Sequence, residues 1–134
     1  YRESCRAYKK QKPMNHFAIT SVLRQLMLND SRIKELVQER IFPLQAPLHT
    51  EGDFILYKRD GYSTSESKMG EFQREPLVFI NIVSENYDRS QKLAGFVHDC
   101  LVGFYDTMQI SLIDSTEEIT DKKYIQILLF KIKL

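Results

Sequence analysis

The segment Ile33–Tyr57 reads IKELVQERIFPLQAPLHTEGDFILY, and three local patterns follow one another within it. From Ile33 to about Val37 the apolar residues have the spacing of a short amphipathic helix. Two prolines then bracket a bend from Pro43 to Pro47, because proline lacks a backbone donor and fixes φ. The final run, Phe54–Tyr57, has the composition of a strand. Helix, bend and strand in this order are typical of an α+β domain.

Two further helices are predicted on either side of this segment. Upstream, apolar residues recur at helical spacing from His16 to about Leu28, and Asp30 or Ser31 is expected to cap the short helix that follows. Downstream, Asn86 is expected to cap a longer helix. The apolar stripe of this helix follows the i, i+3, i+4, i+7, i+8, i+11 pattern and consists of Leu93, Phe96, Val97, Cys100, Leu101 and Phe104.

The remaining regular segments have the period of β-strands. A first strand is predicted from Phe54 to Asp60 and a second from Leu77 to Ser84, and the polar segment Gly61–Gln73 between them is expected to be a flexible loop. The second strand is apolar on both faces, so neither face is expected to be fully solvated. Two final strands, Met108–Thr116 and Lys123–Leu134, are joined by the polar turn Glu117–Lys122.

Together these elements predict an α+β fold. It would have a mostly antiparallel sheet of four or more strands, two main helices packed on one face, and a long loop between the first two strands. The length of 134 residues fits one domain, which is expected to span residues 14–134. The second strand, the long helix and the third strand could form a crossover, which would be right-handed if those strands are parallel. The second face of the sheet would meet a partner or more of the same chain.

Charge is unevenly distributed, although the net charge is only +1. Residues 1–13 carry five basic side chains and one acidic side chain, a balance of +4, whereas residues 14–134 carry 14 basic and 17 acidic side chains, a balance of −3. Two alternatives stay open for residues 1–13: a basic tail that contacts nucleic acid or an acidic surface, or a segment that is disordered or is translated from upstream of a start at Met14. The longest apolar runs are far shorter than the roughly 20 residues that cross a bilayer.

No catalytic, metal-binding or cofactor-binding constellation is predicted. His98, Asp99 and Cys100 are the residue types of a nucleophilic triad, but consecutive helical side chains point about 100° apart and cannot converge on one substrate atom. The expected arrangement is a buried Cys100 beside an exposed His98 and Asp99. The three histidines, which include His16 and His49, lack the spacing of metal ligands. There is also no glycine-rich nucleotide-binding motif.

The chain resembles the tail-terminator, or tail-completion, proteins of long-tailed bacteriophages over roughly Ser31–Leu134. The resemblance rests on the order and spacing of several segments rather than on one motif. These segments are Arg40-Ile-Phe-Pro-Leu44 with Ala46-Pro47, Phe54-Ile-Leu-Tyr57, Lys68-Met-Gly70, the alternating strand Leu77–Val83, Ser84-x-x-Tyr87-Asp88, Ile113-Asp-Ser115 and the closing strand Tyr124–Ile132. The extension before Met14 departs from the pattern of the family.

This resemblance implies a phage or prophage virion structural protein rather than an enzyme. The chain would form a homo-oligomeric ring, expected to be a hexamer, that caps the tail tube protein, stops tube growth and joins the tail to the head-completion (connector) protein. It would assemble in the host cytoplasm and act at the head-proximal end of the tail. The resemblance implies no cofactor, metal, small-molecule substrate or membrane, and at most transient contact with passing DNA.

Contacts with a neighbouring subunit or with the tube are expected on the first two strands and their loop, which can become ordered on assembly. The residues predicted for this interface are Tyr57, Tyr62, Ser65, Lys68, Met69, Phe72 and Phe79. For the aromatic residues among them, an ordinary place in the core is the alternative. The main alternative function is a small cytoplasmic adaptor or binding domain, and a hydrolase or transferase that uses His98, Asp99 or Cys100 is a third hypothesis.

Overall fold

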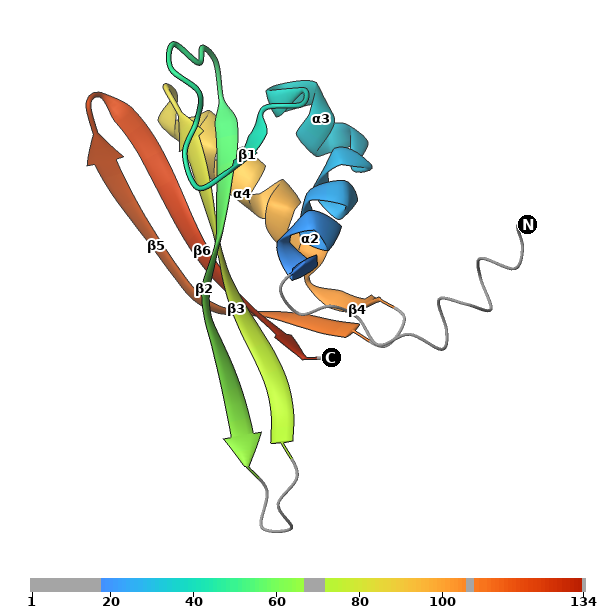
Figure 1. The fold of residues 1–134 in the computed structure, drawn as a ribbon. Helices are drawn as coiled ribbons and strands as arrows, with labels where there is room; N and C mark the ends of the chain where they lie inside the picture. The colour runs from blue at the N-terminus through green and yellow to red at the C-terminus, as the bar shows by residue number, and fades with distance from the viewer. Residues whose placement is uncertain (1–17, 67–71, 106–107, 134) are drawn as a thin grey trace.

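The computed structural model describes residues 18–66, 72–105 and 108–133, with side chains throughout except at 61–66 and 72–74. Within these ranges the chain forms three helices and one six-stranded, mostly antiparallel sheet (Figure 1). This is the α+β fold that the sequence predicts. No helix in the described ranges is long and apolar enough to cross a membrane.

The three helices begin and end close to the predicted positions. Helix α2 spans Ile19–Leu28 and α3 spans Ser31–Val37. The side chain of Asp30 caps α3, because Oδ1 accepts hydrogen bonds from the backbone N–H groups of Arg32 (2.9 Å) and Ile33 (3.3 Å). Helix α4 spans Tyr87–Leu101, and the Asn86 side chain accepts a hydrogen bond from the backbone N–H of Arg89 at 2.9 Å. Asn86 is therefore confirmed as the cap of this helix.

The strand order in the sheet is β1-β2-β3-β6-β5-β4. Strand β1 pairs with β2 in the parallel sense, and every other neighbouring pair is antiparallel. Since β6 lies antiparallel between them, β3 and β5 point the same way, and α4 lies in the crossover that joins them. The bounds are β1 Ile41–Pro43, β2 Phe54–Glu66, β3 Phe72–Ser84, β4 Gly103–Tyr105, β5 Met108–Thr120 and β6 Lys123–Lys133.

Strands β2 and β3 continue into Gly61–Gln73, the segment expected to be a loop. Their pairing runs without a break from Gly61↔Leu77 to Glu66↔Phe72, and within this segment residues 67–71 lie outside the described residues. A bulge between Arg59 and Gly61 shifts the register before this extension. Polar residues can extend a hairpin once its strands are in register, because each added pair continues an existing ladder. The prediction that the first strand ends at Asp60, which relied on the polar composition of the next residues, is therefore wrong: β2 continues to Glu66.

The last hairpin also differs from the sequence prediction. Strand β5 continues to Thr120 rather than Thr116, so the connection is the two-residue turn Asp121-Lys122 instead of Glu117–Lys122. Both turn residues have positive φ, +52° for Asp121 and +65° for Lys122. Positive φ at both central residues is the geometry of a type I′ turn, whose twist matches that of the flanking strands. Asp121 is a residue that this turn favours, but Lys122 stands where glycine is usual, so the sequence signal of the turn is incomplete.

The apolar stripe of α4 ends before Phe104, which the sequence places on the helix. The C-cap residue Val102 is extended, with ψ 128°, and Gly103 has φ +142°. A φ of this kind favours glycine and redirects the chain into β4. Phe104 therefore lies in a short strand and is 78% exposed. The rest of the stripe is buried or partly buried as predicted.

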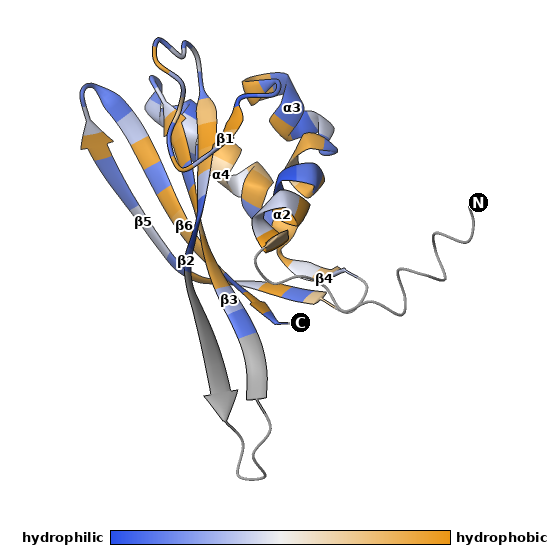
Figure 2. Ribbon diagram, in the orientation of Figure 1, coloured by the Kyte–Doolittle hydropathy of each residue, from blue (hydrophilic) through white to orange (hydrophobic). Residues whose placement is uncertain are grey.

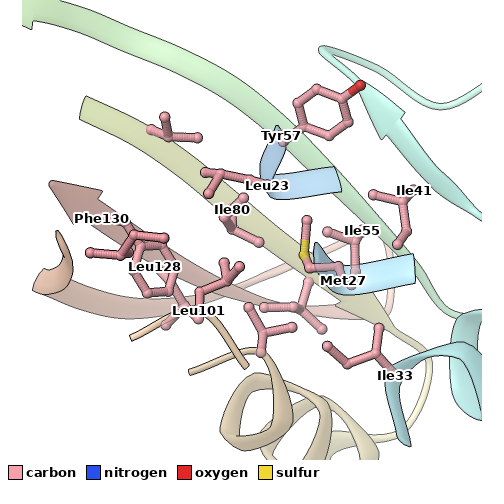
Figure 3. Packing of buried hydrophobic residues seen from close by; sticks show 14 of the residues in the cluster. Leu23, Met27, Ile33, Ile41, Ile55, Tyr57, Ile80, Leu101, Leu128 and Phe130 are labelled. Atoms are coloured by element: carbon pink, nitrogen blue, oxygen red, sulfur yellow. The ribbon is translucent and has the colours of Figure 1, made fainter. Parts of the chain in front are cut away.

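The hydrophobic core lies between the helices and one face of the sheet. In Figure 2 apolar residues recur along all three helices and along β2, β3 and β6. Figure 3 shows side chains from α2, α3 and α4 meeting those of the sheet. Core residues that are fully buried include Ile19, Leu23, Met27, Ile33, Val37, Ile55, Val78, Ile80, Ile82, Leu93, Val97, Leu101 and Phe130. Burying one such side chain contributes about 1.5–3 kcal/mol, so this face holds most of the stabilisation.

Candidate assembly surface

The opposite face of the sheet is also largely apolar. Paired residues in neighbouring strands share a face, so the register defines which side chains lie together across β2, β3 and β6. Three rows lie on the face that the core does not use: Phe54, Val83 and Ile125; Leu56, Asn81 and Ile127; and Lys58, Phe79 and Leu129. We call these nine residues the outer face. Seven of them are apolar, which matches the prediction that the strand Leu77–Ser84 has no polar side.

No helix in the described part of the chain covers the outer face. Phe54 and Val83 are 7% and 6% exposed, yet neither belongs to the core cluster on the helix side. The ring of Phe54 is covered by the Phe42 ring, 6.4 Å away between centroids, and by the ammonium of Lys123, 5.5 Å from its centroid. The other apolar members are partly exposed. Contiguous exposed apolar surface is typical of a binding surface, whereas single exposed apolar residues are common everywhere.

A buried polar atom lies in the middle row of the outer face. Within the described residues, Oδ1 of Asn81 is buried and has no hydrogen-bond partner. Its neighbours in the row, Leu56 and Ile127, cannot supply a donor from their side chains. A buried acceptor without a partner costs about 1–3 kcal/mol and calls for an explanation. A donor from an associating molecule would provide one only if the Asn81 side chain turned outward, because Oδ1 is already covered by this chain.

The residues predicted for the interface fall into four groups. Phe79 lies on the outer face and is partly exposed. Tyr57 lies on the other face and is only 8% exposed, so it has the place in the core that was the alternative to an interface role. Tyr62, Ser65 and Phe72 are paired positions of the β2–β3 hairpin. Lys68 and Met69 lie outside the described residues, and the interface role of the set stays a prediction. Sequence reasoning missed the contributions of Phe54, Leu56, Ile125, Ile127 and Leu129 to the outer face.

The segment Ile33–Tyr57 fixes the start of β2 against the helices. The guanidinium of Arg40 donates through Nε to the backbone oxygen of Asp53 at 2.9 Å, and the backbone N–H of Ile55 donates to the oxygen of Arg40 at 2.9 Å. Gly52 has φ +83°, and a Cβ built there would lie 2.9 Å from Nη2 of Arg40. The positive φ favours glycine at this position, and any larger residue would also displace the end of the Arg40 side chain. These contacts hold the first residues of β2 in the register that places Phe54 and Leu56 on the outer face.

The triad residue types on α4 do not form a catalytic centre. The Cys100 thiol donates to the backbone oxygen of Leu26 at 3.4 Å, and burial raises its pKa to about 11. A thiol with a raised pKa is a poor nucleophile at neutral pH. His98 and Asp99 are exposed beside it, with Nδ1 of His98 3.4 Å from Oδ1 of Asp99. Among the described residues no group of three or more histidine, cysteine or acidic side chains could hold a metal ion.

No protein-family model and no curated protein matches the chain. Among solved structures, the fold is similar to that of a chain described as "Virion of native gene transfer agent (GTA) particle". The TM-score is 0.69 at 13% sequence identity, and the match covers 83% of this chain and 90% of that chain. At this identity the likeness shows a shared fold. The architecture described above is thus one that also occurs in a chain of a gene transfer agent virion.

Proposed function

We propose that the protein is a structural component of a phage-like virion, and that it forms a homo-oligomeric ring that caps the tail tube and joins the tail to the head. Two observations support a virion protein. The first is the series of sequence segments whose order and spacing resemble those of tail terminators. The second is the fold shared with a chain of a gene transfer agent virion. The apolar outer face carries the proposal further, because it gives the chain a surface for association. In this role the protein would have no substrate and no cofactor.

The outer face favours association for two physical reasons. Apolar side chains in adjacent rows gain free energy when a partner removes them from water, at about 25 cal/mol per Å². The Asn81 acceptor, which is covered in the single chain, would also gain a hydrogen bond if its side chain turns outward and the partner supplies a donor. A ring requires two different surfaces on each subunit, because neighbours in a closed ring meet head to tail. We propose that the outer face is one of these two surfaces.

The test is the oligomeric state of the full chain, measured by light scattering alone and with purified tail tube protein. The expected result is a ring of defined mass, alone or on the end of the tube. Leu129→Lys, which places a charge on the outer face, is expected to abolish the assembly while the circular dichroism spectrum stays unchanged. Leu48→Lys is the matched control, since Leu48 is 85% exposed in the loop before β2. A chain that stays monomeric at high concentration and does not bind tail tube protein would overturn the proposal.

A further inference from the structure

A pocket of about 510 Å³ lies between the start of α4 and the final hairpin. Its lining includes Glu117 and Gln126, a register pair that is not part of the outer face. It opens to solvent and is lined by Tyr87, Glu117, Glu118, Ile119, Tyr124 and Gln126. Two of these side chains are tyrosines whose rings meet edge to face, with centroids 5.4 Å apart and planes at 62°. Two others are carboxylates, and none is basic. The pocket thus combines aromatic surface with negative charge.

The carboxylate of Glu117 is held in one place by neutral donors. The hydroxyl of Tyr87 lies 3.0 Å from Oε1 and 3.2 Å from Oε2, and Nε2 of Gln126 donates to Oε2 at 2.8 Å. Gln126 is only 7% exposed, and its Nε2 also donates to Oγ of Ser90 at 3.2 Å. The Ser90 hydroxyl is fully buried and donates to the backbone oxygen of Tyr87 at 2.6 Å. The buried side chains of Gln126 and Ser90 therefore help to position the carboxylate of Glu117, which itself lies in the exposed second half of β5.

This negative charge has no basic partner in the described part of the chain. Neither Glu117 nor Glu118 forms a salt bridge there. Two basic residues near the pocket in sequence are engaged elsewhere: Arg89 pairs with Asp53, and the ammonium of Lys123 lies over the Phe54 ring on the outer face. A third, Lys122 in the turn of the final hairpin, forms no salt bridge with Glu117 or Glu118 in the described part of the chain. Each Glu117 oxygen can still accept a further hydrogen bond, because a carboxylate offers about four acceptor sites. The pocket is complementary to a cation that brings its own donors.

We propose that this pocket receives the side chain of an arginine from an assembly partner. The planar guanidinium can donate two N–H groups to both oxygens of Glu117, a geometry that strengthens the pair and orients it. Its face can lie against the ring of Tyr124 or Tyr87, which attracts a cation within about 6 Å. The methylene stem can lie along Ile119, which is 63% exposed. A metal ion lacks the further ligands it needs here, and an anion would be repelled.

The site does not depend on the proposed ring, because it needs only a partner that presents arginine. The alternative explanation is that the network merely ties the hairpin to α4. The two explanations differ in one respect: a structural tie has no affinity for a free arginine side chain. A neutral isostere of arginine therefore separates them, since citrulline keeps the shape and loses the charge.

The experiment is an NMR titration of the full-length protein with N-acetyl-arginine amide, and with N-acetyl-citrulline amide as the comparison. The expected result is a saturable shift of the Tyr87, Tyr124 and Gln126 side-chain signals with arginine, and at least tenfold weaker binding of citrulline. Glu117→Gln is expected to weaken arginine binding at least tenfold, whereas Glu85→Gln, outside the pocket, is the matched control. Tyr124→Leu keeps the carboxylate and removes one ring, so it should weaken binding even if Glu117→Gln perturbs the fold. Equal binding of the two amides, or no saturable shift, would overturn the proposal.

A second arm of the same experiment identifies the source of the arginine. The chain itself carries Arg2 and Arg6 in its basic first segment. If these residues occupy the pocket of the same or another copy, they compete with the probe, and the double variant Arg2→Gln/Arg6→Gln will bind the probe more tightly. If the affinity for the probe is unchanged by the double substitution, the arginine is neither Arg2 nor Arg6 and is presented by another segment of a second copy or by a different protein. Both results uphold the site and distinguish its partners.

Discussion

Arg89 and Asp53 form a two-point ion pair: Nε of Arg89 lies 2.9 Å from Oδ2 of Asp53, and Nη2 lies 3.1 Å from Oδ1. The pair joins the first turn of α4 to the residue that precedes β2, across 36 positions of sequence. The Asp53 side chain is only 4% exposed, whereas that of Arg89 is 47% exposed. The hydrogen bonds to Asp53 raise the pKa of Arg89. This contact fixes the position of α4 relative to the strand that begins the outer face.

Replacing Arg89 with methionine is expected to lower the free energy of unfolding by about 1–3 kcal/mol, because the Asp53 carboxylate would stay buried without its main partner. The loss should be smaller than for a fully buried pair, since water screens the exposed side of Arg89. Urea denaturation measures it. Arg32→Met is the matched control: Arg32 is 46% exposed, and its partner Asp30 is 14% exposed. Equal losses in the two variants would contradict the importance of the buried carboxylate.

The cap of α3 predicts a pH-dependent stability. Asp30→Ala is expected to cost about 1 kcal/mol near pH 7, because the N–H groups of Arg32 and Ile33 lose their acceptor. Hydrogen bonding from Arg32 lowers the pKa of Asp30 below its ordinary value, although burial opposes the shift. A lowered folded-state pKa contributes stability that is present above the unfolded-state pKa and lost as the pH falls through the folded-state pKa.

The difference between wild type and Asp30→Ala should therefore shrink as the pH falls below about 4, the unfolded-state pKa of aspartate. Urea denaturation between pH 7 and pH 3 measures this difference. Asp30→Asn is the control, because asparagine also caps helices but does not titrate. A difference between wild type and Asp30→Ala that is the same at every pH would show that the charge of Asp30 contributes nothing to the cap.

The turn Asp121-Lys122 offers a stabilising substitution. Lys122 has φ +65°, and a residue with a side chain costs about 1–2 kcal/mol in the left-handed region. Lys122→Gly removes this cost but adds freedom to the unfolded chain, so a net gain of about 0.5–1 kcal/mol is expected. Thermal unfolding followed by circular dichroism measures the gain. Lys122→Ala keeps the Cβ and removes the charge, and it should give no gain; a similar gain from alanine would assign the effect to charge instead.

How far the sequence predicts the fold depends on how local each signal is. The helices follow from apolar spacing and from the caps Asp30 and Asn86, because capping involves only the next few residues. The extension of β2 through Glu66 could not be predicted from local sequence. Its polar residues adopt a strand conformation because they pair with β3. Strand β1 was not predicted, because Pro43 indicated a bend. A proline is, however, tolerated at the end of a short edge strand such as β1.

The candidate surface is predicted only in outline for a related reason. The two apolar sides of Leu77–Ser84 indicate that β3 has something on each face, and the structure confirms apolar neighbours on both. The residues that lie beside β3 depend on the order of strands in the sheet. No local sequence pattern predicts that β6 rather than β5 is its neighbour. The pocket of Tyr87, Glu117 and Gln126 likewise joins residues from α4, β5 and β6 that are distant in sequence.

Asn81 gives a prediction of opposite sign for the single chain and for its assembly. Asn81→Val is expected to raise the free energy of unfolding of the monomer by about 1 kcal/mol, because it removes a buried acceptor that has no partner in the described residues. If a neighbouring molecule donates to Oδ1 when the outer face is covered, the same substitution should weaken association about fivefold. Urea denaturation at low protein concentration and a light-scattering dilution series measure the two effects.

Gln109→Val, at an exposed position of β5, is the matched control and should change neither. A valine variant that is more stable and also associates more tightly would show that nothing donates to Asn81 in the assembly, and the outer face would then bind its partner through apolar contacts alone.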